Sequence, residues 1–361
     1  MKNEVQYKHG GTPRLDMVRL SVPYGQVLDF SVNLNPLGPP AIIKEKWGEL
    51  FEQIEQYPSV EGDGVTHYYQ TICGIPPRNL LAGNGSTELI YLAPRVLRFK
   101  RVAVVTPSYH DYERASLLAG AKVVRCPLSP HDDFAFPAES QMIEVLNNVD
   151  ALWIGRPNNP TGTLFPKRLI LELAERFAEK WFIVDEAFAQ FVVDWEENSF
   201  LTTEPRPNII VVHSLTKFYA IAGLRLGGVV GSEQVISRFK KAKEPWTVNG
   251  IADRTASLLV ECADYEDETR SVVKKERERV FHGLRGLDGV IPFSPSANYI
   301  LCQWVKTGNL DDLLRHLLSN GVYVRDCRNF PGLEKNFFRI GLKTIEDNDR
   351  LLSLLSSFEL F

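Results

Sequence analysis

Short apolar runs rich in β-branched residues alternate with longer amphipathic stretches through the middle of the chain. The runs predict six strands, and stretches such as Asp111–Gly120 and Pro166–Lys180 predict helices between them. Strands joined in turn by helices are typical of a mostly parallel sheet with helices on both faces. The predicted strands are Arg101–Val105, Lys122–Cys126, Asp150–Gly155, Trp181–Asp185, Asn208–His213 and Leu226–Gly231.

The pattern changes on either side of this α/β region. After Pro245 a charge-rich helical stretch extends to about Gly286, and strands are then predicted at Ala297–Gln303, Gly321–Val324 and Phe337–Gly341. The first residues carry several turn signals, which predict an arm that packs on other elements. Because 361 residues exceed the usual size of one core, we expect three parts. These are an arm over 1–45 that packs with the small domain, a large α/β domain over 46–245 and a small α+β domain over 246–361.

Charge and composition exclude several function classes. The 41 basic and 45 acidic residues give a net charge of −4 with no basic tract, so no nucleic-acid partner is expected. No run of about eighteen apolar residues predicts a membrane helix, and the first residues lack the apolar block of a signal peptide. We therefore expect a cytoplasmic protein without a membrane partner. The five cysteines are scattered and never form C-x-x-C, which predicts neither disulfides nor a metal site.

Lys217 ends the segment His213-Ser214-Leu215-Thr216-Lys217, just beyond a predicted strand. A lysine in this place can form a Schiff base with an aldehyde cofactor. Ser214 and Thr216, together with Arg225, can hold a phosphate through charge-assisted hydrogen bonds. A lone lysine is more often a solvated surface residue, so the interpretation needs support from other segments.

Two further polar residues follow predicted strands. Asp185 stands at the carboxyl end of Trp181–Asp185, where open α/β sheets bind ligands, and it can pair with a protonated pyridine nitrogen. Its alternatives are a helix cap or a magnesium ligand. Asn158, in R-P-N-N-P-T-G, can donate to a phenolate oxygen, although Asn, Pro and Gly also make plain turns.

A glycine-rich turn at 83–88 precedes a helix predicted to begin near Leu89. Free backbone N–H groups at a helix start, with the hydroxyls of Ser86 and Thr87, make a phosphate cradle. The same residues also read as a helix-capping sequence.

Five motifs in register resemble the fold-type I pyridoxal-phosphate enzymes of the aspartate aminotransferase class: N-G-S-T-E, P-S-Y, N-N-P-T-G, V-D-E-A and S-L-T-K-x7-R. The resemblance covers nearly the whole chain and implies that fold, that cofactor and a homodimer. It makes Lys217 the Schiff-base lysine, Asp185 the partner of the pyridine nitrogen and Asn158 the partner of the ring oxygen. It places Tyr109 on the ring face as a third catalytic residue. It assigns the rest of the cofactor site to Gly85, Ser86, Thr87, Ser214, Thr216 and Arg225, with Tyr57 reaching the neighbouring subunit's cofactor phosphate.

One departure from the family pattern concerns the cofactor ring. Many members have a tyrosine three residues after the aspartate, where it hydrogen-bonds the ring oxygen. This chain has Phe188 there. Loss of that donor should leave the ring oxygen more basic.

The substrate residues are predicted from the two ends of the chain. By the same resemblance Arg339, in F-F-R-I-G, grips the α-carboxylate of an amino acid. The segments H-G-G (9–11), D-F-S-V-N-L-N-P-L-G (29–38) and V-R-D-C-R-N-F (324–330) resemble the L-threonine-O-3-phosphate decarboxylases of cobalamin biosynthesis, relatives of the histidinol-phosphate aminotransferases. The implied substrate residues are His9, Asn158, Arg325 and Arg339. Alternatively, His9 belongs to a free arm, Arg325 pairs with an acid such as Asp326, and Arg339 is a surface arginine in a salt bridge.

The resemblance implies decarboxylation of L-threonine phosphate or L-serine phosphate to CO₂ and a phosphorylated amino alcohol for the cobalamin nucleotide loop. The two substrates differ by one methyl group, worth only about 1–3 kcal/mol in a pocket. A histidinol-phosphate-type aminotransferase is the first alternative. A non-catalytic cofactor-sensing module is a remote one, because the chain has no appended basic helix-turn-helix domain.

Overall fold

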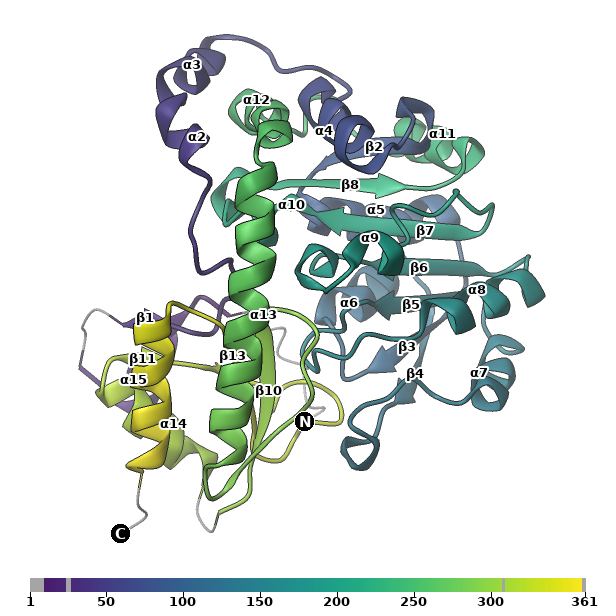
Figure 1. The fold of residues 1–361 in the computed structure, drawn as a ribbon. Coiled ribbons are helices and arrows are strands. Elements are labelled where there is room, and N and C mark those ends of the chain that lie inside the picture. Colours follow the sequence, from purple (N-terminus) through teal and green to yellow (C-terminus); the bar gives the residue numbers. More distant parts are fainter. Residues whose placement is uncertain (1–9, 24–26, 307–308, 359–361) are drawn as a thin grey trace.

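A seven-stranded sheet forms the centre of the larger part of the molecule (Figure 1). The computed structural model describes residues 10–23, 27–306 and 309–358. All neighbouring strands of this sheet run parallel except β8, which is antiparallel to the strand on each side. In spatial order the strands are β2 (Leu80–Asn84), β8 (Leu226–Val230), β7 (Ile209–Ser214), β6 (Trp181–Asp185), β5 (Ala151–Gly155), β3 (Arg101–Thr106) and β4 (Lys122–Pro127).

Consecutive residues of the central strands enter two different cores. In β5, Leu152 and Ile154 join one buried cluster while Ala151 and Trp153 join the other. Strands buried on both faces therefore read as continuous apolar runs, which is why the sequence predicted them well. One face is covered by α5 (Gly85–Leu97), α6 (His110–Leu118) and α11 (Glu233–Ala242). The other is covered by α4 (Asp63–Cys73), α7 (Glu139–Leu146), α8 (Lys167–Arg176) and α12 (Gly250–Leu258).

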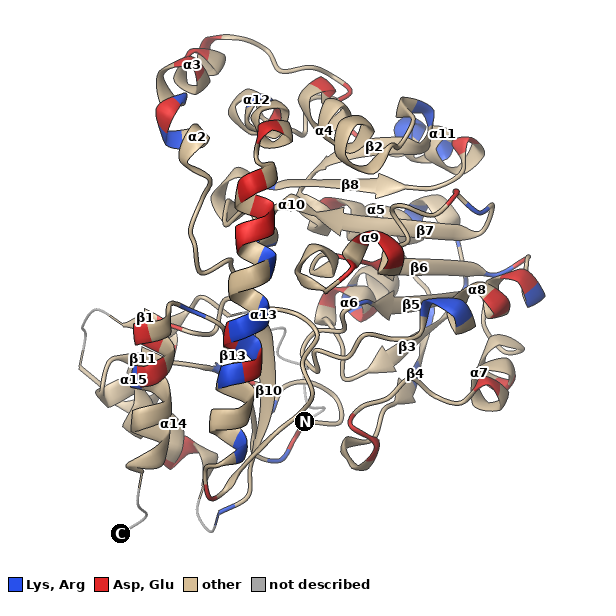
Figure 2. Cartoon of the chain, viewed as in Figure 1, with Lys and Arg blue, Asp and Glu red and all other residues tan. Residues whose placement is uncertain are grey.

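The smaller part is built on an antiparallel sheet in the order β12-β13-β10-β9. The long helix α13 (Ala263–Arg285) packs on this sheet and also reaches the larger part (Figure 1). Figure 2 shows that the first turns of α13 are acidic, which suits the positive end of the helix dipole. The remaining elements of this part are β9 (Val290–Pro292), β10 (Tyr299–Trp304), α14 (Leu310–Ser319), β11 (Val322–Tyr323), β12 (Arg325–Asp326), β13 (Phe337–Gly341) and α15 (Ile345–Ser356).

The N-terminal segment contacts both parts. Strand β1 (Leu28–Asp29) pairs in parallel with β11, and helix α1 (Pro13–Leu20) packs on α14. The backbone N–H of Asn35 donates to the carbonyl of Lys217 at 3.1 Å. Next come the short helices α2 (Ala41–Glu45) and α3 (Trp47–Phe51), and two more, α9 (Trp195–Asn198) and α10 (Leu215–Phe218), lie further along the chain.

The predicted fold class is confirmed, with corrections of detail. Strands β1, β2, β9 and β12 were not predicted, and the helix after the glycine-rich turn, α5, begins at Gly85 and not near Leu89 as expected. The charge-rich stretch up to Gly286 is broken into α12 and α13. The predicted domain boundaries stay predictions; α12, just beyond residue 245, packs on α4. Within the described residues no helix is both long and apolar enough to cross a membrane.

Candidate active site

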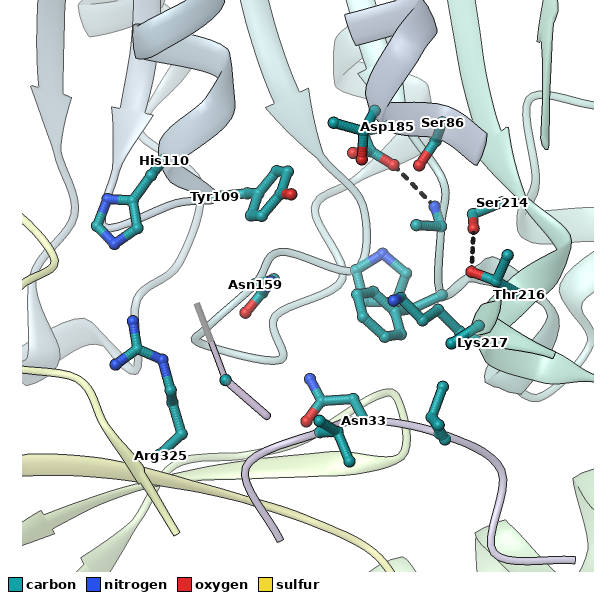
Figure 3. A pocket seen from close by; sticks show the side chains of 18 of the residues that line it. Asn33, Ser86, Tyr109, His110, Asn159, Asp185, Ser214, Thr216, Lys217 and Arg325 are labelled. Carbon is teal, nitrogen blue, oxygen red and sulfur yellow. Dashed lines mark hydrogen bonds between the residues drawn. The ribbon is translucent and has the colours of Figure 1, made fainter. Parts of the chain in front are cut away.

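A pocket of about 290 Å³ lies where the carboxyl ends of β5, β6 and β7 face the smaller sheet. Figure 3 shows Lys217 pointing into it, with Ser214 and Thr216 nearby and His110 and Arg325 at the opposite end. The position agrees with the rule that open α/β sheets bind ligands at the carboxyl ends of their strands. Most of the predicted site residues line it: Ser86, Thr87, Tyr109, Asp185, Ser214, Thr216, Lys217, Arg225, Arg325 and Arg339.

The start of α5 and Arg225 form a cradle for an anion. Gly85 has φ of +74°, and a Cβ built on it would lie 2.6 Å from Nη2 of Arg225. A side chain there would therefore push the guanidinium away from the helix start. The hydroxyls of Ser214 and Thr216 are 2.8 Å apart on the neighbouring wall. Backbone N–H groups, hydroxyls and a guanidinium are the donors that a phosphate group requires.

Lys217 is almost fully enclosed at the centre of the pocket. It lies in the short helix α10, directly after β7. Burial, with the neighbouring charges of Arg225 and Arg339, lowers the pKa of Lys217 to about 8, although Asp185 acts in the opposite direction. A lysine with this pKa is partly neutral near neutral pH, as attack on an aldehyde requires.

Asp185 ends β6 and is held from two sides. The hydroxyl of Tyr112 donates to its Oδ2 at 2.8 Å, and the backbone N–H of Ala187 donates to Oδ1 at 2.9 Å. Burial raises the pKa of Asp185 to about 6, against the lowering effect of both donors and of Lys217. A buried carboxylate of this kind is stabilised by a cationic partner, such as a protonated ring nitrogen.

Asn158 lies behind the wall of the pocket, and its neighbour Asn159 lines it. The Asn158 amide donates to the carbonyl of Pro107 and the hydroxyl of Thr161, each at 2.9 Å, while its Oδ1 is buried without a partner. Beside it, the ring of Phe188 packs edge-on against Tyr299 with centroids 4.9 Å apart. This wall therefore has an apolar ring where the family pattern has a hydroxyl.

Arg325 and Arg339 lie directly opposite each other on the paired strands β12 and β13. Both are buried, 3% and 5% exposed. Arg339 donates to the carbonyl of Ser31 at 2.8 Å and to Oδ1 of Asn159. Burial, with a further contribution from the charge of Arg325, lowers the pKa of Arg339 to about 10.

Besides Asn158, the predicted residues Gly85 and Tyr57 do not line this pocket. Gly85 lies behind Arg225, as described above. Tyr57 is 88% exposed and packs on Trp246 with ring centroids 5.5 Å apart, so in the single chain it does not reach the site. His9 lies outside the described residues, next to Gly10, which lines the pocket.

Several residues that line the pocket were not predicted, among them Tyr112, Asn159, His110 and Asn33. Tyr112 stands three positions after Tyr109, which directly precedes α6, and this spacing could have been read from the sequence. Asn159 directly follows Asn158, which was predicted as a site residue. Asn33 lies within the segment 29–38 and His110 directly follows the P-S-Y motif, but only the packing of distant segments shows that these two residues reach the pocket.

Comparison with known proteins gives the family. Residues 26–355 match the aminotransferase class I and II family. The chain is 33% identical over 355 residues to the threonine-phosphate decarboxylase of Salmonella typhimurium, covering 96% of this chain and 95% of that protein. It is 30% identical over 359 residues to the adenosylcobalamin biosynthesis bifunctional protein CobDQ of Leptospira interrogans, covering 97% of this chain and 41% of that protein.

A solved structure agrees with these matches. The crystal structure of the histidinol-phosphate aminotransferase from Clostridium acetobutylicum has a TM-score of 0.85 to this chain at 28% identity, covering 91% of this chain and 98% of that one. The anion cradle, the enclosed Lys217 and the buried Asp185 fit the phosphate, aldehyde and ring nitrogen of pyridoxal phosphate. The chain therefore belongs to the aminotransferase class I and II family and is a pyridoxal-phosphate-dependent enzyme.

Proposed function

We propose that this enzyme decarboxylates an O-phospho-L-amino acid, L-threonine phosphate or L-serine phosphate, in the synthesis of the cobalamin nucleotide loop. The products are CO₂ and a phosphorylated amino alcohol. The names of the Salmonella and Leptospira relatives support the reaction and the pathway. The free state of all five cysteines fits the reducing cytoplasm, where we propose that it acts.

The pairing of Arg325 with Arg339 is the observation that carries this proposal. Like charges directly opposite each other on paired strands repel, and burial increases that cost. An anionic ligand removes the repulsion. Two guanidinium groups fit a substrate that carries both a carboxylate and a phosphate, since guanidinium binds either group in a bidentate manner.

Lys217 and the residues around it would then each have a separate role in the reaction. Bound in the cradle, pyridoxal phosphate supplies an electron sink for the bond broken at the substrate's α-carbon. Asp185 would hold the proton of the ring nitrogen, and the aromatic ring of Tyr109 would pack against the cofactor. Nζ of Lys217, pointing into the pocket, returns a proton to the α-carbon after CO₂ leaves. Arg339, fixed by Ser31 and Asn159, sets the orientation of the carboxylate.

We further propose a homodimer in which Tyr57 reaches the partner's cofactor phosphate. Tyr57 is exposed, and its ring packs at a tilt against Trp246, which is itself 50% exposed. Other exposed apolar side chains belong to the same stretch of the chain, and such clusters mark protein interfaces. They are Trp47, Phe51, Ile54 and Val60.

A histidinol-phosphate-type aminotransferase is the second candidate, favoured by the similarity to the Clostridium acetobutylicum structure. It uses the same cofactor residues and also needs an anion site at the substrate end. The two candidates differ in which bond at the α-carbon stands perpendicular to the cofactor ring: the bond to the carboxylate for decarboxylation, the C–H bond for transamination.

A product assay separates the two candidates. Cofactor-loaded protein is incubated separately with L-threonine phosphate, L-serine phosphate, and histidinol phosphate with 2-oxoglutarate. We expect CO₂ and a phosphorylated amino alcohol from one or both of the first two. Glutamate without CO₂ would instead establish the aminotransferase, and no product from any of the three would favour the sensing module.

A further inference from the structure

A chain of three side chains joins α6 to the segment after β12 at the substrate end of the pocket. His110, the first residue of α6, lines the pocket and is 5% exposed. Its ring stacks on Phe330, with centroids 4.1 Å apart and planes at 21°. Nε2 of His110 is 3.1 Å from Nδ2 of Asn329, and Oδ1 of Asn329 accepts from Nη2 of Arg325 at 3.0 Å.

The chemistry of the two end groups fixes the direction of the Asn329 amide. A guanidinium only donates, so Asn329 must turn its oxygen to Arg325 and its NH₂ group to His110. Nε2 of His110 is then the acceptor, which requires a neutral ring with its proton on Nδ1. A residue without an acceptor at this place would remove this hydrogen bond from the Asn329 amide.

The Asn329 contact defines how Arg325 faces the pocket. Nη1 of Arg325 donates to the carbonyl of Asp326 and Nη2 donates to Asn329, so the two terminal nitrogens are held by two different neutral groups. Neutral acceptors of this kind fix the direction of a guanidinium without themselves neutralising its charge. Some holder is needed, because Arg339 on the opposite strand repels Arg325.

We propose that His110 is a positioning residue for the substrate: acting through Asn329, it directs the guanidinium of Arg325 toward an anionic group of the ligand. This rests on the proposed function, in which Arg325 binds such a group. His110 belongs to the larger part of the molecule and Arg325 to the smaller sheet, so the contact also joins the two parts at the substrate end of the pocket.

Paired substitutions separate the hydrogen bond from the ring stacking. His110→Phe keeps a ring against Phe330 and removes the acceptor, whereas His110→Gln keeps an acceptor near the position of Nε2 and removes the ring. Asn329→Leu removes the amide that connects His110 to Arg325. The control is His131→Phe, at an exposed histidine of a surface turn.

The readout is the dissociation constant of 3-phosphoglycerate for the holoenzyme, measured by calorimetry. This probe carries a carboxylate and a phosphate but no amino group, so it binds without reacting. The KM and kcat for L-threonine phosphate are measured in parallel. The absorbance of the lysine-bound cofactor shows in each variant that the cofactor end is intact.

We expect His110→Phe and Asn329→Leu each to weaken binding on the order of tenfold, in Kd and KM, with little change in kcat. His110→Gln and His131→Phe should bind like the wild type. Because His110 acts through Asn329, the double variant His110→Phe, Asn329→Leu should be no weaker than Asn329→Leu alone.

Three results would overturn the proposal: wild-type binding in His110→Phe, additive losses in the double variant, or equal losses in the Phe and Gln variants. Failure of the proposed function is a different result, since wild-type protein would then bind 3-phosphoglycerate yet release no CO₂ from L-threonine phosphate. If the wild type neither bound the probe nor acted on L-threonine phosphate, both proposals would be wrong.

Discussion

At the end of the pocket around Lys217, the functional side chains follow strands of the large sheet, whereas the end around Arg325 combines three separate segments. Asp185 ends β6, and Lys217 comes three residues after β7. The far end is lined by Gly10 and residues 31–34 of the N-terminal segment, by the start of α6, and by the smaller sheet through β12 and β13. The cofactor end thus depends on local sequence at one sheet edge. The substrate end depends on how distant parts of the chain pack.

The largest effect is expected from Lys217→Ala, which removes the only covalent link proposed for the cofactor. We expect the absorbance of lysine-bound cofactor to disappear and turnover to fall by roughly 10³-fold or more. The cradle with Arg225 should still retain cofactor without a covalent bond. Lys122→Ala, at an exposed position of β4, is the control and should change neither signal. Retained absorbance of the lysine-bound form would mean that Lys217 is not the attachment site.

Arg339→Ala should weaken ligand binding at the substrate end of the pocket and leave cofactor binding unchanged. The variant loses a buried cation and its bonds to Ser31 and Asn159, so we expect the Kd of a substrate analogue to rise about a hundredfold. Cofactor absorbance should stay as in the wild type. Arg315→Ala, whose side chain is 50% exposed, serves as the control. Parallel loss of cofactor and ligand would show that the two ends are not independent.

The lowered pKa of Lys217 predicts how cofactor capture depends on pH. Only the neutral amine attacks an aldehyde, and with a pKa of about 8 its neutral fraction grows from about 1% near pH 6 to about half near pH 8. The rate of cofactor capture by the apo-enzyme should therefore rise about fifty-fold over this range and level off above about pH 9. A rate that still climbs nearly tenfold between about pH 8 and pH 9 would mean an ordinary, solvated lysine.

The smallest of these effects concerns Tyr112, whose hydroxyl lowers the pKa of Asp185 by donating to it. In Tyr112→Phe this pKa should rise further above about 6, so more of the carboxyl is protonated at neutral pH. We expect the affinity for the cofactor to fall about three- to tenfold. On acidification, the affinity should also begin to fall at a higher pH than in the wild type.

Titration of the cofactor Kd against pH checks the Tyr112 prediction. The matched control is Tyr323→Phe, which removes a hydroxyl that donates to Asp16 outside the pocket. If cofactor affinity fell at the same pH in Tyr112→Phe as in the wild type, the hydrogen bond from Tyr112 would not control the pKa of Asp185.

The site residues that were predicted because they follow strands belong to the cofactor end of the pocket. Asp185, Ser214, Thr216 and Lys217 were found because each stands directly after an apolar run that could only be a strand. Tyr112 was missed although its spacing from Tyr109 was readable. Strand β2 was missed because glycines and an asparagine hid its short apolar start.

The sequence by itself determined the central sheet, the family motifs and the chemistry of the cofactor end, because these depend on neighbours in the chain and on strands buried on both faces. Only the tertiary structure decided that Arg325 and Arg339 face each other, that Asn158 supports the wall while Asn159 lines it, and that His110 reaches Asn329. The reason is physical. Contacts between residues more than two hundred positions apart are set by how the small sheet and the N-terminal segment pack on the large one, and no local periodicity encodes that packing.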